Sequence, residues 1–459
     1  MRSALLAHAV RGNSGSPARG HGYHDQTVLS RLDLRGCTDL GGALARPEND
    51  DVPIDTVRGI IGAVRARGDS AVREFTERFD GCRIHELRVP TSEVRAALEA
   101  ADPELVAALK LAADRIRAYH EQQLTPAPAS FERDGITVRE LTLPVARAGL
   151  YVPGGRAAYP STVLMTAIPA HLAGVSELAL CVPPDDEGRI AAATLVAAAL
   201  VDVDEVYRIG GAQAIAALAY GTETVRPVDV VVGPGNVYVA LAKREVAGTV
   251  GLDSFAGPSE IVIVADGSIP AAFAAADLLA QAEHGPGGVA VLVAWNDDVI
   301  ADTIAALDGQ LATVPRRAEI ECALRDGGRA VLVDDAVAAI DVVNEIAPEH
   351  LELLTADPDA LLPLVRHAGA VFCGPWAPAA LGDYVAGANH VLPTARTARF
   401  ASALRVDTFR KHLHVVDATE AGLARVAPAL AVIATAEGLD AHAQSVTRRA
   451  LSVHQDARP

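Results

Sequence analysis

The chain has 459 residues, more than the roughly 250 to 300 residues that one hydrophobic core accommodates, so two or more domains are expected. The composition, 50% hydrophobic and 21% charged, is typical of a packed globular protein. A formal net charge of −18 disfavours nucleic acid and anionic membrane surfaces as partners, because both attract clusters of Lys and Arg.

The cysteines are far apart and include no CxxC pair. They are Cys37, Cys82, Cys181, Cys322 and Cys373. An odd number without close spacing argues against a disulfide framework and favours a reducing compartment. No uncharged apolar run reaches the roughly 18 residues that a membrane span needs. We therefore expect a cytoplasmic protein without a membrane segment.

The first part of the chain divides into an extension and a helical region. Residues 1–27 lack apolar periodicity and are expected to be a disordered extension. Residues 28–129 are expected to form a helical N-terminal part that packs on the second sheet domain. Apolar residues recur three and four apart in Val57–Val64, Val72–Phe79 and Leu105–Ile116. The segment Thr125–Glu132 contains two prolines and is interpreted as a linker.

The remainder has an α/β pattern. Over residues 130–256, short β-branched runs alternate with Ala-rich stretches, which favours a parallel sheet with crossover helices. Its expected strands are Ala148–Val152, Leu178–Val182, Glu205–Ile209 and Val228–Val232. The pattern restarts over residues 257–383, with expected strands Glu260–Ala265, Val289–Ala294, Ala330–Val333, Leu351–Thr355 and Ala370–Phe372. The fold class is therefore α/β with two Rossmann-like parallel-sheet domains, and residues 384–459 form a separate C-terminal arm of loops and helices.

Three glycine-rich turns follow expected strands of the first sheet. They are Tyr-Val-Pro-Gly-Gly at 151–155, Gly-Gly-Ala-Gln at 210–213 and Gly-Pro-Gly-Asn at 233–236. Open parallel sheets bind ligands beyond the carboxyl ends of their strands, and a helix N-terminus offers unpaired N–H groups to a pyrophosphate. Each turn taken alone also fits a plain strand-to-helix connection. Because neither GxGxxG nor GxxxxGK occurs, any NAD site departs from the ordinary Rossmann fingerprint.

Polar residues at useful spacings lie in the second half. Gln281 and His284, three apart near the end of an expected helix over 270–283, share one helical face and offer two metal ligands. A His at a helix end also fits an interaction with the helix dipole. Glu349 and His350 precede an expected strand and could supply a water-activating base and a proton acceptor. Glu349 fits a solvated loop charge equally well.

Further candidate metal-binding or polar site residues lie towards the C-terminus. Asp383 follows the last expected strand of the second sheet, where a carboxylate can bind a metal. Glu437 and His442 are five apart, close to but not at same-face helical spacing. Taken alone, this pair fits an exposed amphipathic helix.

Seven strings occur in an order and at separations that resemble the histidinol dehydrogenase family. They are GLYVPGG, GGAQAIAALAYG, GPGN, AGPSE, QAEHG, PEHLEL and GDYVAGANHVLPT, and the resemblance covers roughly residues 28 to 455. QAEHG, PEHL and the run from GDY to NHVLPT are together highly specific.

The resemblance implies a set of site residues. A metal site with one Zn²⁺ per subunit is formed by Gln281, His284, Asp383 and His442. His442 comes from the partner subunit of a homodimer with shared active sites, through an exchanged C-terminal arm. Glu349 and His350 are catalytic, and the NAD site is lined by Tyr151, Gln213 and Asn236. The substrate-binding residues are Ser259, Gln281, His284, His350, Asp383, Glu437 and His442.

The implied reaction is a four-electron oxidation of L-histidinol through L-histidinaldehyde to L-histidine, with two NAD and a zinc-dependent site. His350 would accept the hydroxyl proton, Glu349 would activate a water for the second oxidation, and the metal would chiefly orient the substrate. No cysteine is assigned a role. Ala388 stands where Thr or Ser is usual in the family, and the segment 403–405 (Ala-Leu-Arg) replaces a smaller one that contains Gly or Ser. These departures leave every proposed ligand and both proposed catalytic residues in place.

Three alternatives remain. A family relative could oxidise another amino alcohol or diol, and Glu437, a carboxylate suited to an ammonium group, favours histidinol over those. A metal-dependent hydrolase would use Glu349 to activate water and would show no NAD dependence. A non-catalytic NAD-sensing protein is disfavoured, because it gives no reason for a metal set beside a Glu-His pair.

Overall fold

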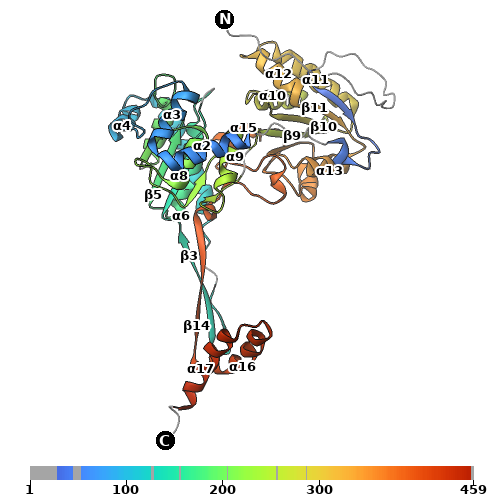
Figure 1. Cartoon of the computed structure of the whole chain (residues 1–459). Coiled ribbons are helices and arrows are strands. Elements are labelled where there is room, and N and C mark those ends of the chain that lie inside the picture. The colour runs from blue at the N-terminus through green and yellow to red at the C-terminus, as the bar shows by residue number, and fades with distance from the viewer. Residues whose placement is uncertain are drawn as a thin grey trace, which may run out of the picture.

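The computed structural model describes residues 28–44, 53–125, 129–154, 157–203, 205–254, 257–285 and 287–455. The expected extension at 1–27, Gly155 and both prolines of the expected linker lie outside these ranges. The described residues form two parallel sheets and one antiparallel sheet. Figure 1 shows two α/β bodies next to each other and a long arm that leaves the first of them. Among the described helices, none combines the length and apolar character that a bilayer crossing requires.

The first sheet is fully parallel, with strand order β6-β5-β4-β7-β8. Its strands are β4 (Arg147–Tyr151), β5 (Glu177–Val182), β6 (Glu205–Arg208), β7 (Val230–Val232) and β8 (Gly251–Leu252). Four helices connect them: α6 (Pro160–Ala173), α7 (Ala192–Leu200), α8 (Gly211–Tyr220) and α9 (Val237–Val246). Strands β4 to β7 are buried on both faces, as their continuous apolar runs require, and these are the four strands expected in this region.

The second sheet is also fully parallel, with order β1-β11-β10-β9-β12-β13. Its strands are β1 (Ser30–Asp33), β9 (Glu260–Ala265), β10 (Val289–Ala294), β11 (Gly328–Leu332), β12 (His350–Leu354) and β13 (Ala370–Cys373). The helices are α10 (Ala271–Ala282), α11 (Asp297–Leu311), α12 (Arg317–Gly327), α13 (Ala336–Ile346), α14 (Pro358–Leu361) and α15 (Ala379–Tyr384). Apart from β1, its strand order repeats that of the first sheet. This confirms two Rossmann-like domains of similar topology.

Most of the N-terminal helices pack on the first sheet domain, so the expectation that they pack on the second is wrong for them. They are α2 (Ile54–Arg67), α3 (Asp69–Asp80), α4 (Thr91–Glu99) and α5 (Pro103–Glu121), whereas α1 (Leu40–Ala43) contacts α13 of the second sheet domain. Helices α2 and α3 contact α8, while α4 and α5 contact α7 and α6. The reason is burial: the apolar face of α2, with Val57 and Val64, completes a core made by the Ala-rich α8. In this region only β1 joins the second sheet.

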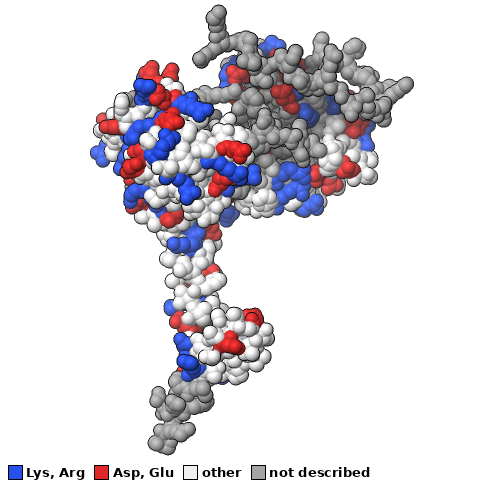
Figure 2. Space-filling model, in the orientation of Figure 1, with Lys and Arg blue, Asp and Glu red and all other residues white. Residues whose placement is uncertain are grey.

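The arm is built from two distant parts of the chain. Strand β3 (Ile136–Pro144) pairs antiparallel with β14 (Arg410–Ala418) along their full length, and β2 (Phe131–Arg133) pairs with β3. Helices α16 (Glu420–Ala436) and α17 (Asp440–Gln455) form the tip. In Figure 2 the paired strands of the arm and its tip carry fewer charged side chains than the surface of the first sheet domain, where Lys, Arg, Asp and Glu are interspersed.

Two expected domain boundaries are therefore wrong. Residues 131–144 were expected to open the first sheet domain but belong to the arm, because β3 is half-exposed along both faces and has no face for a core. Residues 391–409 were expected in the arm, yet Val391, Leu404 and Phe409 are buried in the core of the first domain. This stretch includes short 3₁₀ turns, Thr397–Arg399 and Val406–Phe409, and another lies at Leu362–Leu364.

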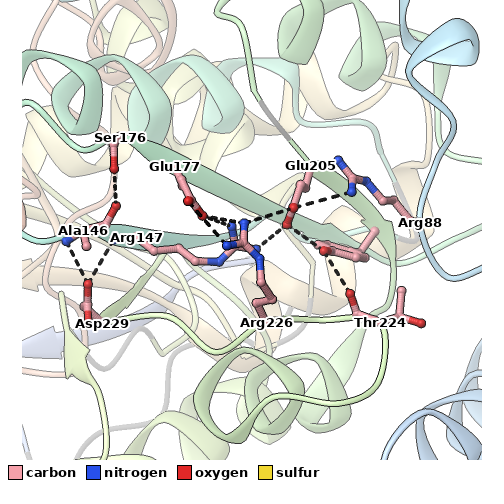
Figure 3. A network of polar contacts seen from close by, with 10 residues as sticks. Arg88, Ala146, Arg147, Ser176, Glu177, Glu205, Thr224, Arg226 and Asp229 are labelled. Atoms are coloured by element: carbon pink, nitrogen blue, oxygen red, sulfur yellow. Dashed lines mark hydrogen bonds and ion pairs between the residues drawn. The ribbon is translucent and has the colours of Figure 1, made fainter.

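A buried polar network ties the amino ends of three strands of the first sheet (Figure 3). Arg147 on β4 contacts Glu205 on β6, and it donates to Glu177 on β5 at 2.8 Å. Tyr207 donates to Glu205 at 2.7 Å, and Arg226 donates to Glu177 at 2.5 Å. Because buried charges are costly unless paired, this network favours one register of the strands. It lies at the edge opposite the glycine-rich turns.

Candidate active site

The carboxyl edge of the first sheet holds a cavity of about 640 Å³. Tyr151 at the end of β4, Gln213 in the first turn of α8 and Asn236 before α9 all line it. The three residues that sequence reasoning assigned to NAD thus lie around one space, where an open parallel sheet is expected to bind a ligand. Carboxylates of the N-terminal part and of the β5–α7 connection, Asp80 and Asp185, line the same cavity.

The three lining residues differ in what they can still bind. Tyr151 is buried, and its hydroxyl accepts a hydrogen bond from Gly211 N at 3.0 Å, which joins two of the glycine-rich turns. Gln213 is buried, and its Oε1 has no hydrogen-bond partner among the described residues, so it is open to a ligand. Asn236 caps α9, because its Oδ1 accepts from Tyr238 N and Val239 N at 3.1 and 3.2 Å. Its side-chain nitrogen is left for a ligand.

A second cavity, of about 220 Å³, lies between the two sheet domains. The first domain contributes Pro234 and Gly235, which follow β7, and the second contributes Ser259 before β9 together with Glu349 and His350 at the start of β12. His284 and Asp383 also line it. The candidate catalytic residues therefore gather at the amino edge of the second sheet. A cavity at its carboxyl edge contains none of the predicted site residues.

Glu349 is a buried carboxylate held in one orientation. Its Oε2 accepts hydrogen bonds from Ser259 Oγ at 2.6 Å and from Glu260 N at 3.0 Å. Burial raises the pKa of Glu349, although His350 and these hydrogen bonds oppose that effect. A carboxylate with a raised pKa is a stronger base than one in water, and neither hydrogen bond uses Oε1.

His350 is buried beside two carboxylates. Its Nδ1 donates to the carbonyl oxygen of Glu260 at 3.1 Å, and its Nε2 lies 3.5 Å from Asp383 Oδ1. Burial lowers the pKa of His350, but Glu349 and Asp383 outweigh this and raise that pKa to about 9. The bond at Nδ1 fixes the ring so that Nε2 is the nitrogen available for proton transfer.

Three of the four predicted metal ligands come from one chain. Gln281, in the last turn of α10, is buried, and none of the described residues hydrogen-bonds its Nε2. His284 is exposed to the cavity, and the surrounding protein lowers its pKa, which favours the neutral imidazole that binds metals. Burial would raise the pKa of Asp383, but His350 outweighs it and lowers that pKa, so the carboxylate is ionised.

One chain leaves this ligand set incomplete. Within the described ranges, no three His, Cys, Asp or Glu side chains are placed to hold a metal together. His442 lies in the first turn of α17 and Glu437 just after α16; both are exposed. Figure 1 shows that the tip of the arm is remote from both sheet domains. The structure of one chain thus does not bring His442 or Glu437 to Asp383.

Two residues near the second cavity were not assigned by sequence reasoning. His390 Nδ1 donates to the carbonyl oxygen of Asp383 at 2.8 Å, and Thr162 Oγ1 lies 3.1 Å from its Nε2. Asn389, next to it, donates to Met165 O at 2.7 Å. These bonds tie the segment that carries Asp383 to helix α6. The polar pair Asn389-His390 between small and apolar residues was the available signal, but it did not reveal the partners in α6.

Comparisons with known proteins agree with the resemblance in the sequence. A family model described as histidinol dehydrogenase matches residues 44–450. A histidinol dehydrogenase of Synechococcus sp. is 50% identical over 400 residues, covering 87% of this chain and 92% of the relative. One of Rhizobium meliloti is 49% identical, covering 92% of this chain and 98% of the relative.

The comparison of folds gives the same answer. The crystal structure of histidinol dehydrogenase from Elizabethkingia anophelis superposes with a TM-score of 0.89 at 33% identity. The match covers 94% of this chain and 100% of that one, which includes both sheet domains and the arm. The chain belongs to the histidinol dehydrogenase family of oxidoreductases.

Proposed function

We propose that this chain oxidises L-histidinol through L-histidinaldehyde to L-histidine, the last step of histidine biosynthesis, with two NAD and a bound zinc ion. The observation that carries the proposal is the cavity between the sheet domains, where Glu349, His350 and Asp383 face a glycine-rich turn of the NAD side. Membership of the family supports the substrate.

The residues of the first cavity fit NAD. Gln213 Oε1 lacks a partner among the described residues, and the N-terminus of the ten-residue helix α8, whose dipole favours a pyrophosphate, lies at the same edge. Gly211 has a φ of +60°, a conformation that glycine adopts without strain next to a ligand. When bound, NAD supplies the hydride acceptor.

Two residues that line the second cavity, His284 and Asp383, fit a zinc ion together with Gln281 in the last turn of α10. Gln281, His284 and Asp383 offer oxygen and nitrogen donors, with His442 of the partner subunit as the fourth. The Gln281 amide, which has no hydrogen-bond partner at Nε2 among the described residues, can present its oxygen after a simple flip. Such a donor set suits zinc and also accepts manganese or cobalt. When bound, the metal would chiefly orient the substrate through its imidazole.

Proton transfer falls to two residues of this chain. His350 takes the hydroxyl proton at Nε2 while hydride leaves the carbinol carbon, and an aldehyde results. Glu349 takes a proton from a water that adds to the aldehyde. As the water adds, His350 returns its proton to the aldehyde oxygen, and it takes a hydroxyl proton again as the second hydride leaves the hydrate, which yields the carboxylic acid and then the carboxylate. Because its pKa is raised to about 9, His350 becomes a free proton acceptor as the pH rises towards that value.

The arm supports a homodimer with shared sites. Several large apolar side chains on it are exposed in the single chain: Leu141, Leu143, Leu413, Val416, Leu430, Val432, Ile433 and Leu439. Exposed apolar surface of this extent marks an interaction site. A partner subunit that covers the arm would receive His442 and Glu437 at its own cavity, with Glu437 placed for the substrate ammonium group. The five free cysteines support a reducing, cytoplasmic location.

The test is the number of NADH formed per L-histidinol consumed, followed by absorbance with and without a chelator. Two NADH per substrate, lost with the chelator, would support the proposal. If histidinol yields no NADH but another amino alcohol or diol does, that compound would take the place of histidinol as the proposed substrate. Turnover that does not require NAD would favour the hydrolase.

A further inference from the structure

The turn at 233–236 separates the two cavities. Pro234 and Gly235 line the cavity that holds Glu349 and His350, whereas Asn236 lines the cavity at the carboxyl edge of the first sheet. A hydride that passes from substrate in one cavity to NAD in the other must pass beside this turn. Its position therefore decides how the nicotinamide approaches the reacting carbon.

A buried ion pair binds the backbone of this turn at Gly233. Lys243, on α9, is 1% exposed, and its Nζ donates to Gly233 O at 2.5 Å and to Asp253 Oδ1 at 2.6 Å. Asp253 follows β8, and its Oδ2 accepts from Gly233 N at 2.7 Å. The pair thus binds both backbone groups of Gly233. It touches neither cavity, since the residues that line them include neither Lys243 nor Asp253.

The turn is also packed closely on its other sides. Gly233 has a φ of +111°, and a Cβ there would collide with the carbonyl oxygen of Tyr151 at the end of β4. A Cβ at Gly235 would collide with the side chain of Val239 on α9. The turn therefore sits directly on the strand and the helix that carry the NAD-side residues, and a small shift of Gly233 would move Asn236 with it.

Stability alone does not explain a buried Lys-Asp pair at this place. The loss of hydration of two charges offsets much of their attraction, so the ion pair by itself contributes little to stability. An apolar pair, however, offers no acceptor to Gly233 N and no donor to Gly233 O. What the ion pair adds is the position of the turn.

We propose that Lys243 and Asp253 are positioning residues for hydride transfer, which fix the Gly233–Asn236 turn so that the nicotinamide of NAD lies against the cavity of Glu349 and His350. This inference rests on the proposed NAD-dependent function. It predicts that loss of the pair weakens dinucleotide binding and turnover while the metal side and the fold persist.

The test uses the full-length protein and the double variant Lys243→Met/Asp253→Leu, which removes both charges at similar volume. The dissociation constant of NADH is measured by its fluorescence without substrate, and KM for NAD and kcat are measured with L-histidinol. We expect the NADH dissociation constant and KM for NAD to rise about tenfold, since charged hydrogen bonds to the turn are lost. The retained zinc content and the circular dichroism spectrum should match the parent.

The matched control is Arg147→Met/Glu205→Leu, which removes a buried ion pair at the opposite edge of the same sheet (Figure 3). It should leave NADH binding unchanged. If the first double variant does not fold, Asp253→Asn, which keeps one acceptor oxygen for Gly233 N, should show a smaller rise in the same two constants. A folded variant whose NADH affinity and kcat equal those of the parent overturns the positioning role alone. A parent that binds no NADH overturns the proposed function and this inference with it.

Discussion

Glu352 lies fully buried on β12, two residues after His350, and its replacement by glutamine should change how the stability of the second sheet domain depends on pH. One oxygen, Oε1, accepts from Ala379 N at the start of α15 at 2.7 Å. Burial, reinforced by the carboxyl of Asp277 on α10, raises the pKa of Glu352 from 4.5 to about 8. The folded domain therefore keeps a proton that the unfolded chain releases.

The sign and the size of the effect follow from this difference. Because the folded pKa is the higher one, the stabilisation from protonated Glu352 is fully present below about pH 4.5 and is lost as the pH rises through about 8. At about 1.4 kcal/mol per pKa unit, the change between about pH 5.5 and about pH 8.5 is at most about 3 kcal/mol. Relaxation of the domain around the ionised pair reduces this figure, and we expect about 2 kcal/mol. The glutamine side chain has no proton to lose. Between about pH 5.5 and about pH 8.5, the free energy of unfolding of the Glu352→Gln variant should therefore rise relative to that of the parent by this amount.

The assay is urea unfolding followed by tryptophan fluorescence. The chain has two tryptophans, Trp295 after β10 and Trp376 before α15, and both belong to the second sheet domain, so the signal reports on that domain. Asp277→Asn is the control, because it removes the neighbouring charge but leaves Glu352 buried, and its pH dependence should lie between those of the other two proteins. A difference between parent and Glu352→Gln that stays constant from about pH 5.5 to about pH 8.5 would refute the assignment of the proton to this pair.

Three further results are expected. Glu349→Gln should lower kcat by about 10² to 10⁴ fold in steady-state assays while NADH binding persists, and unaltered turnover would exclude Glu349 as the base. A mixture of His442→Ala and His284→Ala chains should regain about a quarter of the parent activity, because half of the dimers are mixed and each of those has one intact site; no recovery would argue against arm exchange. Glu205→Gln should destabilise the first sheet domain by about 2 kcal/mol, as measured by hydrogen exchange of β4 to β6, because the buried Arg147 then keeps Glu177 as its one anionic partner in this network; unchanged protection would show that the Arg147–Glu205 pair is dispensable.

The sequence by itself determined most strands of both sheet domains, although β1 and β8 were not predicted. Strands β9 and β10 occupy Glu260–Ala265 and Val289–Ala294, the ranges expected from the apolar runs. Such runs are local: a strand buried on both faces needs a continuous apolar stretch wherever it lies in the fold. The glycine-rich turns follow such runs directly, whereas the resemblance to the histidinol dehydrogenase family assigned roles to the residues of the two cavities.

Only the tertiary structure decided which distant segments meet. Strand β3 pairs with β14, far away in the chain, and no local pattern in either one specifies its partner. The same holds for the N-terminal helices, whose apolar faces would fit either sheet domain. It also holds for Lys243 and Asp253: the sequence around each is that of an ordinary surface charge, and only the fold brings both side chains to Gly233 and buries them. The local periodicity of a segment shows which of its faces is buried. Which surface covers that face depends on all segments of the chain, because they compete to pack in the same core.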